Sequence, residues 1–208
     1  RPLRPLFPKG FYNDVVVVAT CMSVDPDCSP EIAAMIGSSI AIATSDIPWD
    51  GPTASVKVGR VDGRFVINPT LAQREVSDID MTVAGTKEAI MMVEAGAKEV
   101  PEMVMLDAIL FAHEEIKKIV EFIDQIVAEL GKPKMEIELY KPLEEIDAAV
   151  REYATPKMKE AIHTVDKLER LDNMDAVEVE TKEYFAETYP DNMKDIDAVL
   201  YNITKETV

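Results

Sequence analysis

Apolar residues in the first fifty positions change from strand-like to helix-like spacing within a few residues. The run DVVVVATCMS, residues 14–23, is mostly apolar and β-branched, which predicts a strand covered on both faces. Ser29-Pro30-Glu31 then has the features of a helix start: Ser at the N-cap, Pro at the first helical position and an acid in the first turn. The stretch that follows, IAAMIGSSIAIA, is apolar or small almost all round, so we expect a buried helix.

Two pairs of short β-branched stretches predict two hairpins. Ala54 to Val61 and Arg64 to Asn68 flank Asp62-Gly63, a dipeptide that favours a tight two-residue turn. The stretches 79–86 and 89–95 form a second pair around a Gly-Thr-Lys turn.

A long helix and a domain boundary follow. Residues Glu102 to Leu130 have one apolar face at helical spacing, made of Ile109, Ala112, Ile116, Ile119, Ile123, Ile126 and Leu130. All eight glycines fall at or before Gly131, which suits the position after a helix, and Pro133 would stop any continuation. We therefore predict a mixed domain over 1–131 and an all-α domain over 132–208, with a proline interruption at Pro156.

Composition limits the classes of protein to consider. The formal net charge is −17, which argues against a broad cationic footprint for nucleic acid but leaves room for a local cationic patch. No apolar run approaches the roughly 18 residues of a membrane span, and no signal peptide opens the chain, so we expect no membrane contact. The opening RPLRPLF reads as the interior of a longer chain. Cys21 and Cys28 favour a reduced protein over a disulfide scaffold or a zinc site.

The segment EVSDIDMTVAGT, residues 75–86, carries the first candidate site. In a strand, residues two apart point to one side, so Asp78 and Asp80 could together hold a divalent metal. The next residue on that side is Thr82, which supplies no cation to complete a phosphate site. From these residues alone, a working site, an inactive one and an ordinary polar edge all stay open.

Three cations near the start of the chain form the second candidate. Arg1, Arg4 and Lys9 lie among prolines and aromatic rings, a combination that suits phosphodiester contact and base stacking. The alternative is that an arginine here caps a helix end or pairs with an acid, and the sequence does not decide between the two.

Other polar residues have simpler explanations. His113 is not part of an HExxH motif, because position 117 is Lys, so we expect a half-buried histidine with a hydrogen-bond partner. We assign no role to His163. In SVDPDCSPE, residues 23–31, Asp25 and Asp27 put negative charge where a helix start would bind phosphate, which favours turn and capping chemistry.

Consecutive blocks over most of residues 1–130 resemble the first RNase PH-like domain of the bacterial polynucleotide phosphorylase family. They are RPLRPLFPKGFYNDVVVVATCMSVDPD, IGSSIAIATSDIPWDGP, KVGRVDGRFVINPT, SDIDMTVAGTKEAIMMVEA and ILFAHEEI. The tail, with GKPK and TVDKLER, is similar to the family's all-α linker domain. The resemblance implies an α+β fold: an N-terminally incomplete RNase PH-like β/α domain followed by an all-α domain.

The resemblance also implies an activity for the parent protein. The family forms cytoplasmic, ring-shaped homotrimers that degrade RNA from the 3′ end with inorganic phosphate, using Mg²⁺, and release nucleoside diphosphates. The reaction also runs in reverse. Each full chain has two RNase PH-like domains around the helical linker, followed by RNA-binding domains, and RNA-degradation proteins are further expected partners.

In this family the second RNase PH-like domain carries the reaction. Its aspartate matches Asp80, but its lysine two residues on and its aspartate six residues before are here Thr82 and Arg74. Ser29-Pro30-Glu31 matches the region of its phosphate-binding serines, with acid in place of hydroxyl. The resemblance therefore implies a non-catalytic half with no metal site of its own, with Mg²⁺ bound outside this chain.

Two functions remain as expectations. In the first, the chain assembles the ring, packs against the catalytic domain and guides RNA, with Arg1 and Arg4 as the contacts. In the alternative, it is an independently active metal-dependent RNA hydrolase that uses Asp78 and Asp80.

Overall fold

A computed structural model describes residues 1–208 as two compact units, Arg1–Leu139 and Tyr140–Val208. The division lies eight residues beyond the boundary expected after residue 131. The segment that follows Gly131 is extended and hydrogen-bonds to the first unit: Lys132 N donates to Thr44 O at 3.0 Å and Met135 N donates to Asp46 O at 2.8 Å. These residues therefore belong with the mixed unit.

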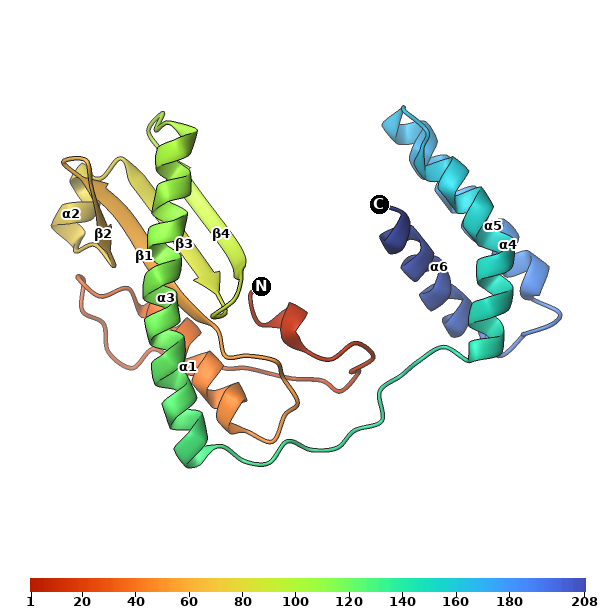
Figure 1. The fold of residues 1–208 in the computed structure, drawn as a ribbon, viewed down its shortest axis with the longest axis horizontal. Coiled ribbons are helices and arrows are strands. Elements are labelled where there is room, and N and C mark those ends of the chain that lie inside the picture. The colour runs from red at the N-terminus through yellow and green to blue at the C-terminus, as the bar shows by residue number, and fades with distance from the viewer. The chain divides into compact units, whose positions relative to one another are not determined.

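The first unit contains a four-stranded antiparallel sheet in the order β2-β1-β3-β4 (Figure 1). Its strands are β1 Ala54–Val61, β2 Arg64–Ile67, β3 Ile79–Gly85 and β4 Ile90–Ala97. Both predicted hairpins are confirmed. The dipeptide between β1 and β2 has φ of +49° and +75°, the left-handed conformation that a two-residue hairpin turn requires.

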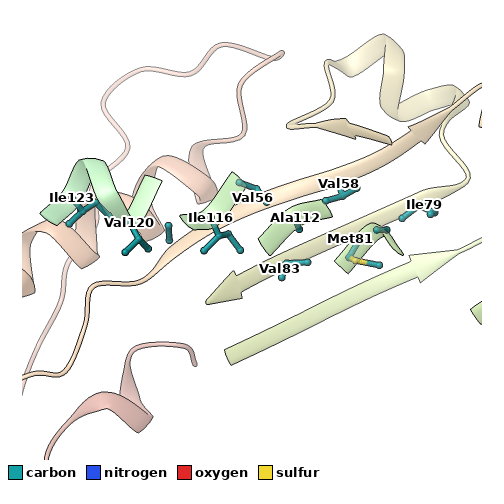
Figure 2. Close-up of a cluster of buried hydrophobic side chains, with 11 residues drawn as sticks. Val56, Val58, Ile79, Met81, Val83, Ala112, Ile116, Val120 and Ile123 are labelled. Atoms are coloured by element: carbon teal, nitrogen blue, oxygen red, sulfur yellow. The ribbon is translucent and has the colours of Figure 1, made fainter. Parts of the chain in front are cut away.

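Helix α3, Glu102–Leu130, packs against one face of this sheet (Figures 1 and 2). Its bounds are those predicted from the apolar spacing. The strands β1 and β3 contribute the other half of the core. Side chains alternate between the two faces of a strand, so every second residue of β1 and β3 points at the helix. The fully buried side chains are Ala54, Val56, Val58, Ile79, Met81, Val83, Ala108, Ala112, Ile116, Val120 and Ile123. Of the predicted face, Ile109, Ile119 and Ile126 lie half-buried at its margins, and Leu130 is exposed.

Three short helices complete the first unit: η1 Arg4–Leu6, α1 Pro30–Thr44 and α2 Leu71–Val76. Helix α1 begins at the predicted Pro30. The expectation that it is buried all round was wrong, because the small residues Ala33, Gly37 and Ala41 lie on an exposed face. Small size permits close packing but does not require it.

The strand predicted over residues 14–23 was also wrong. This segment is irregular and makes no backbone ladder, and Val16 and Val18 are 82% and 80% exposed. A β-branched run has a strand's conformational preference, but a strand forms only where a neighbouring strand supplies hydrogen bonds. None of the four strands pairs with this run.

The second unit consists of α4 Glu144–Ile162, α5 Lys167–Phe185 and α6 Met193–Thr207. Their shared core consists of Ile146, Val150, Ala154, Met158, Phe185, Ile196, Val199, Leu200 and Ile203. Residues 132–208 contain no strand, as predicted, but the expected helix throughout was wrong, since the first helix begins at Glu144. No helix of either unit is long and apolar enough to cross a membrane.

The predicted interruption at Pro156 was wrong as well, because α4 continues through this residue. A proline inside a helix removes one hydrogen bond, which here frees the carbonyl of Glu152 four residues earlier. Both residues are exposed, so water can solvate the freed carbonyl and the helix need not end.

The packing of α3 gives a stability test. Ile116→Ala removes a side chain with 0% exposure and should lower the free energy of unfolding of the first unit by about 2–5 kcal/mol. Denaturant titration followed by fluorescence measures this, because the single tryptophan, Trp49, is buried in the first unit.

Leu110→Ala on the same helix is the matched control. Its side chain is 52% exposed, so its effect should stay within about 0.5 kcal/mol. Equal losses from the two variants would contradict the observed face of α3.

Candidate functional site

Asp78 is held by an arginine from the neighbouring strand. Arg60 Nε donates to Asp78 Oδ1 at 3.0 Å and Oδ2 at 3.1 Å, and Nη2 donates to Oδ2 at 2.5 Å. Hydrogen bonding to this guanidinium lowers the pKa of the Asp78 carboxyl and raises the pKa of Arg60. The charge of Asp78 is therefore already compensated within the chain.

The backbone around Asp78 is tied to the same residues. Ser77 Oγ accepts from Arg60 N at 2.9 Å and donates to Ile79 O at 2.6 Å, and Lys98 Nζ donates to Ser77 O at 3.0 Å. Ser77 and Asp78 thus join the start of β3 to β1 and to the residue that follows β4. This arrangement gives Asp78 a structural role.

Asp80 has different surroundings, although it lies only two residues further on. It is exposed on the sheet face opposite α3, and its cross-strand neighbours are Gly59 on β1 and Gly96 on β4. Asp78 and Asp80 both line a hollow of about 260 Å³ beside Arg74 and Lys98. Asp80 therefore forms no ion pair, and its side chain is accessible to solvent.

A second hollow, of about 470 Å³, lies between the start of α1 and the Asp80 face. Thr82 lines it, and its charged lining residues are Glu31, Lys57, Asp80 and Glu94. Thr82 sits between Lys57 and Glu94 in the cross-strand register. Three carboxylates against one ammonium form a poor site for phosphate. Nor is any group of three or more His, Cys, Asp or Glu side chains arranged to hold a metal ion.

Arg74, on α2, is directed at the loop before α1. Its Nη2 donates to Pro26 O at 2.5 Å, while its Nε is buried without a hydrogen-bond partner. Asp27 supports the same contact from the other side, since its Oδ1 accepts from Leu71 N at 2.8 Å. Asp25 in turn accepts from Asp27 N at 3.0 Å. The loop acids therefore act in turn formation, as their sequence predicted.

The remaining candidates have local partners. His113 is half-buried with Nε2 3.1 Å from Thr86 O, as expected for a histidine with a satisfied hydrogen bond. His163 Nδ1 lies 2.6 Å from Lys159 O at the end of α4. Ser29 Oγ hydrogen-bonds Glu31, which lowers the pKa of that carboxyl, and Ser29 makes no side-chain cap to the α1 backbone. Cys21 and Cys28 are exposed free thiols.

The segment that carries Arg1 and Arg4 is fixed by backbone hydrogen bonds. Trp49 Nε1 donates to Leu3 O at 2.9 Å, and Asp50 N donates to Leu6 O at 2.9 Å. The side chains of Leu3, Leu6 and Phe7 pack around Trp49 and the end of α1. These contacts place both arginines on an ordered backbone.

Both guanidinium groups are exposed, and neither forms an ion pair in the chain. They line a hollow of about 680 Å³ together with Phe7 and Phe11, whose rings stack at a centroid distance of 5.5 Å. No carboxylate lines this hollow. The ion pair considered as an alternative for Arg4 is not formed. We call Arg1, Arg4, Phe7 and Phe11 the arginine surface.

Sequence reasoning missed two cations with structural roles. Arg60 gave no signal, because its pairing with Asp78 depends on the register of β1 against β3. Lys134 lies in the GKPK motif, and its Nζ donates to the carbonyls of Ala43 at 2.9 Å and Ser45 at 2.7 Å at the end of α1. Burial lowers the pKa of this lysine. The sequence did offer a signal for this role, because Lys134 directly follows Pro133, the residue expected to prevent continuation of the helix.

Two family descriptions match separate parts of the chain. Residues 51–115 match the 3′ exoribonuclease family, domain 2, which covers the sheet and the first half of α3. Residues 145–208 match the polyribonucleotide nucleotidyltransferase RNA binding domain, which covers the three-helix unit.

Similar full-length proteins share one name, polyribonucleotide nucleotidyltransferase. The protein from Clostridioides difficile (strain 630) is 68% identical over 185 residues, which is 89% of this chain and 26% of that protein. The protein from Brevibacillus brevis (strain 47) is 56% identical over 212 residues, covering 100% of this chain and 30% of that protein. The chain thus spans less than a third of the length of these relatives. It belongs to the polyribonucleotide nucleotidyltransferase family.

Proposed function

We propose that this chain is the non-catalytic half of a phosphorolytic 3′-to-5′ exoribonuclease, in which it serves ring assembly and RNA guidance. The parent protein would be a cytoplasmic homotrimer that converts RNA and inorganic phosphate into nucleoside diphosphates. The observation that carries the proposal is the environment of Asp80. This carboxylate, which matches a catalytic aspartate of the family's second domain, shares one hollow with Glu31, Glu94 and a single cation, Lys57. The cations of its other hollow, Arg74 and Lys98, already donate to backbone carbonyls.

Phosphorolysis requires cations that hold the attacking phosphate and a metal that neutralises developing charge. The residues around Asp80 do not fit Mg²⁺ either, because Asp78 is committed to Arg60. We therefore assign phosphate and Mg²⁺ binding to the catalytic domain of the parent protein. The same ion pair disfavours the alternative of a hydrolase built on Asp78 and Asp80.

For RNA guidance we favour the arginine surface over the helical unit. The helical unit, Tyr140–Val208, has 17 Asp and Glu residues against 9 Lys and Arg residues. The arginine surface instead combines two unpaired guanidinium groups with two stacked rings. Phosphate contact and base stacking are the two interactions that hold single-stranded RNA.

The first prediction is that the 208-residue chain is inactive. Incubated with RNA, inorganic phosphate and Mg²⁺, it should release no nucleoside diphosphate. Thr82 stands where the family's second domain has a lysine, and the one cation nearby, Lys57, is outnumbered by Glu31, Asp80 and Glu94. Chromatography of the products measures this, with the full-length protein as positive control. Turnover that survives purification and disappears in Asp80→Asn would contradict the proposal.

The second prediction separates the two aspartates. Asp78→Asn should lower the melting temperature at neutral pH, because it breaks the pairing with Arg60. The folded-state pKa of Asp78 is lowered, so the stabilisation is complete well above the unfolded value of about 3.9 and is lost as pH falls below it. The difference between wild type and Asp78→Asn should therefore vanish in acid.

Asp80→Asn is the matched control for this experiment, since Asp80 forms no ion pair and its loss should leave the melting temperature unchanged. Mg²⁺ should not stabilise the wild-type chain. A melting temperature that rises with Mg²⁺ and ceases to rise in either variant would favour the hydrolase instead.

The third prediction concerns RNA. Arg4→Ala in the full-length protein should weaken binding of single-stranded RNA, and the slope of log affinity against log salt should become shallower by about 0.7 for one lost phosphate contact. Arg64→Ala is the control, because Arg64 is an exposed, unpaired arginine on β2 of the same unit. Equal effects of the two variants, or unchanged affinity of Arg4→Ala across the salt series, would exclude the arginine surface.

A further inference from the structure

Helix α1 ends against the N-terminal segment, the part of the chain that carries Arg1 and Arg4. Ile42 and Ala43, in the last turn of α1, are buried in one cluster with Trp49. Apolar side chains of the N-terminal segment pack against this cluster, and Ile42 also lines the hollow of the arginine surface. The last turn of α1 therefore supports the backbone that positions both arginines.

The end of α1 has no cation of its own. The last carbonyl groups of a helix have no partner within the helix and carry partial negative charge, which a nearby basic side chain can stabilise. Helix α1 has no basic residue in its last turn, and its sequence, PEIAAMIGSSIAIAT, contains none at any position. A stabilising cation has to come from another part of the chain.

Lys134 supplies this cation from beyond the end of α3. Its Nζ donates to the carbonyl oxygens of Ile42 at 3.3 Å, Ala43 at 2.9 Å and Ser45 at 2.7 Å. A lysine ammonium group has three N–H donors, so these three acceptors use all of them. Backbone hydrogen bonds on either side of Lys134 fasten its segment to the same part of the chain.

Lys134 is not itself part of the arginine surface. It does not line the hollow that contains Arg1 and Arg4, and its connection with that hollow is indirect. The end of α1 packs on Trp49, and the Trp49 indole Nε1 donates to Leu3 O at 2.9 Å, between the two arginines. Loss of the Lys134 ammonium would leave the α1 carbonyls to water and loosen the last turn, which would also loosen Trp49 and the N-terminal segment.

We propose that Lys134 is a positioning residue of the arginine surface: it orders the last turn of α1 and, through Trp49, the backbone that presents Arg1 and Arg4 to RNA. This inference rests on the RNA guidance proposed above. The role differs from a direct phosphate contact, because Lys134 would release no counterion from RNA. It also differs from a general role in folding, since the expected change is confined to the end of α1 and the N-terminal segment.

The test uses the 208-residue chain, in which Trp49 is the single tryptophan. Lys134→Met removes the charge and the donors. Tryptophan emission should then shift to longer wavelength, and acrylamide should quench it more strongly, because water reaches the loosened indole.

RNA affinity is measured on the same chain by fluorescence anisotropy, with a labelled single-stranded oligoadenylate as the probe. In Lys134→Met the affinity should fall about fivefold, because RNA would then have to order the N-terminal segment as it binds. The slope of log affinity against log salt should stay that of the wild type, since the arginines that contact phosphate remain.

Two further variants show which property of Lys134 matters. Lys134→Arg retains the charge and the donors, so emission should match the wild type and affinity should lie within about twofold of it. Lys134→Gln keeps amide donors without the charge and should change both measurements in the direction of Lys134→Met, but less. Lys134→Gln becomes the test variant if circular dichroism shows that Lys134→Met has lost helix content.

Lys132→Met is the matched control. The Lys132 side chain is exposed, and it is the backbone N of this residue that donates to Thr44 O. The variant therefore removes the same charge two residues away and keeps the backbone hydrogen bond. Tryptophan emission should be unchanged, and RNA affinity should stay within about twofold of the wild type.

Three results would overturn the positioning role. They are unchanged emission and affinity in Lys134→Met, equal losses in Lys132→Met, and a salt slope that becomes shallower by about 0.7 in Lys134→Met, which would indicate a direct phosphate contact. Arg4→Ala in the same chain separates these failures from failure of the proposed function. If Arg4→Ala binds RNA as tightly as the wild type, RNA guidance is rejected, whereas the emission of Lys134→Met still decides whether Lys134 orders the N-terminal segment.

Discussion

The packing of α3 against the sheet decides which side chains of β3 are available for chemistry. Because strand residues alternate, burial of Ile79, Met81 and Val83 beneath α3 places Asp80 and Thr82 on the other face. A shift of one residue in the register would bury the aspartate and expose the core. The core thus holds the sheet in one register, and this register decides which side chains of β3 the open face presents.

Charge is distributed unevenly over an acidic chain. Both units carry more acids than bases, yet the arginine surface has no carboxylate in its lining. At physiological salt, exposed charges interact over roughly 8 Å, so a ligand responds to the local groups more than to the total. An anionic ligand would therefore meet favourable local charge at the arginine surface despite the negative net charge of the chain.

Local signals in the sequence predicted the elements whose stability is local. The Asp62-Gly63 turn and the apolar period of α3 were sufficient to locate both elements, because turn conformation and helix amphipathicity are properties of neighbouring residues. Residues 14–23 could not be predicted in this way, since a strand depends on a partner elsewhere. Pro156 misled because solvent exposure, which no local pattern encodes, decides whether a helix tolerates proline.

The same distinction applies to the candidate sites. The spacing of Asp78 and Asp80 predicted that the two share one side of a strand, and both line one hollow in the structure. The pairing of Asp78 with Arg60 was not predictable, because it arises from cross-strand register across eighteen positions. Arg1 and Arg4 were identifiable from composition, whereas their freedom from ion pairs required the tertiary structure.

The hydrogen bonds that Leu3 and Leu6 make with Trp49 and Asp50 have a thermodynamic consequence for the arginine surface. Ordering a flexible backbone costs about 1–2 kcal/mol per residue, and a disordered tail with the same arginines would incur that loss on meeting a ligand. Here the folding of the first unit has already ordered the backbone. A ligand at this surface would restrict only the rotamers of the arginine side chains, so its affinity would carry a smaller entropic penalty.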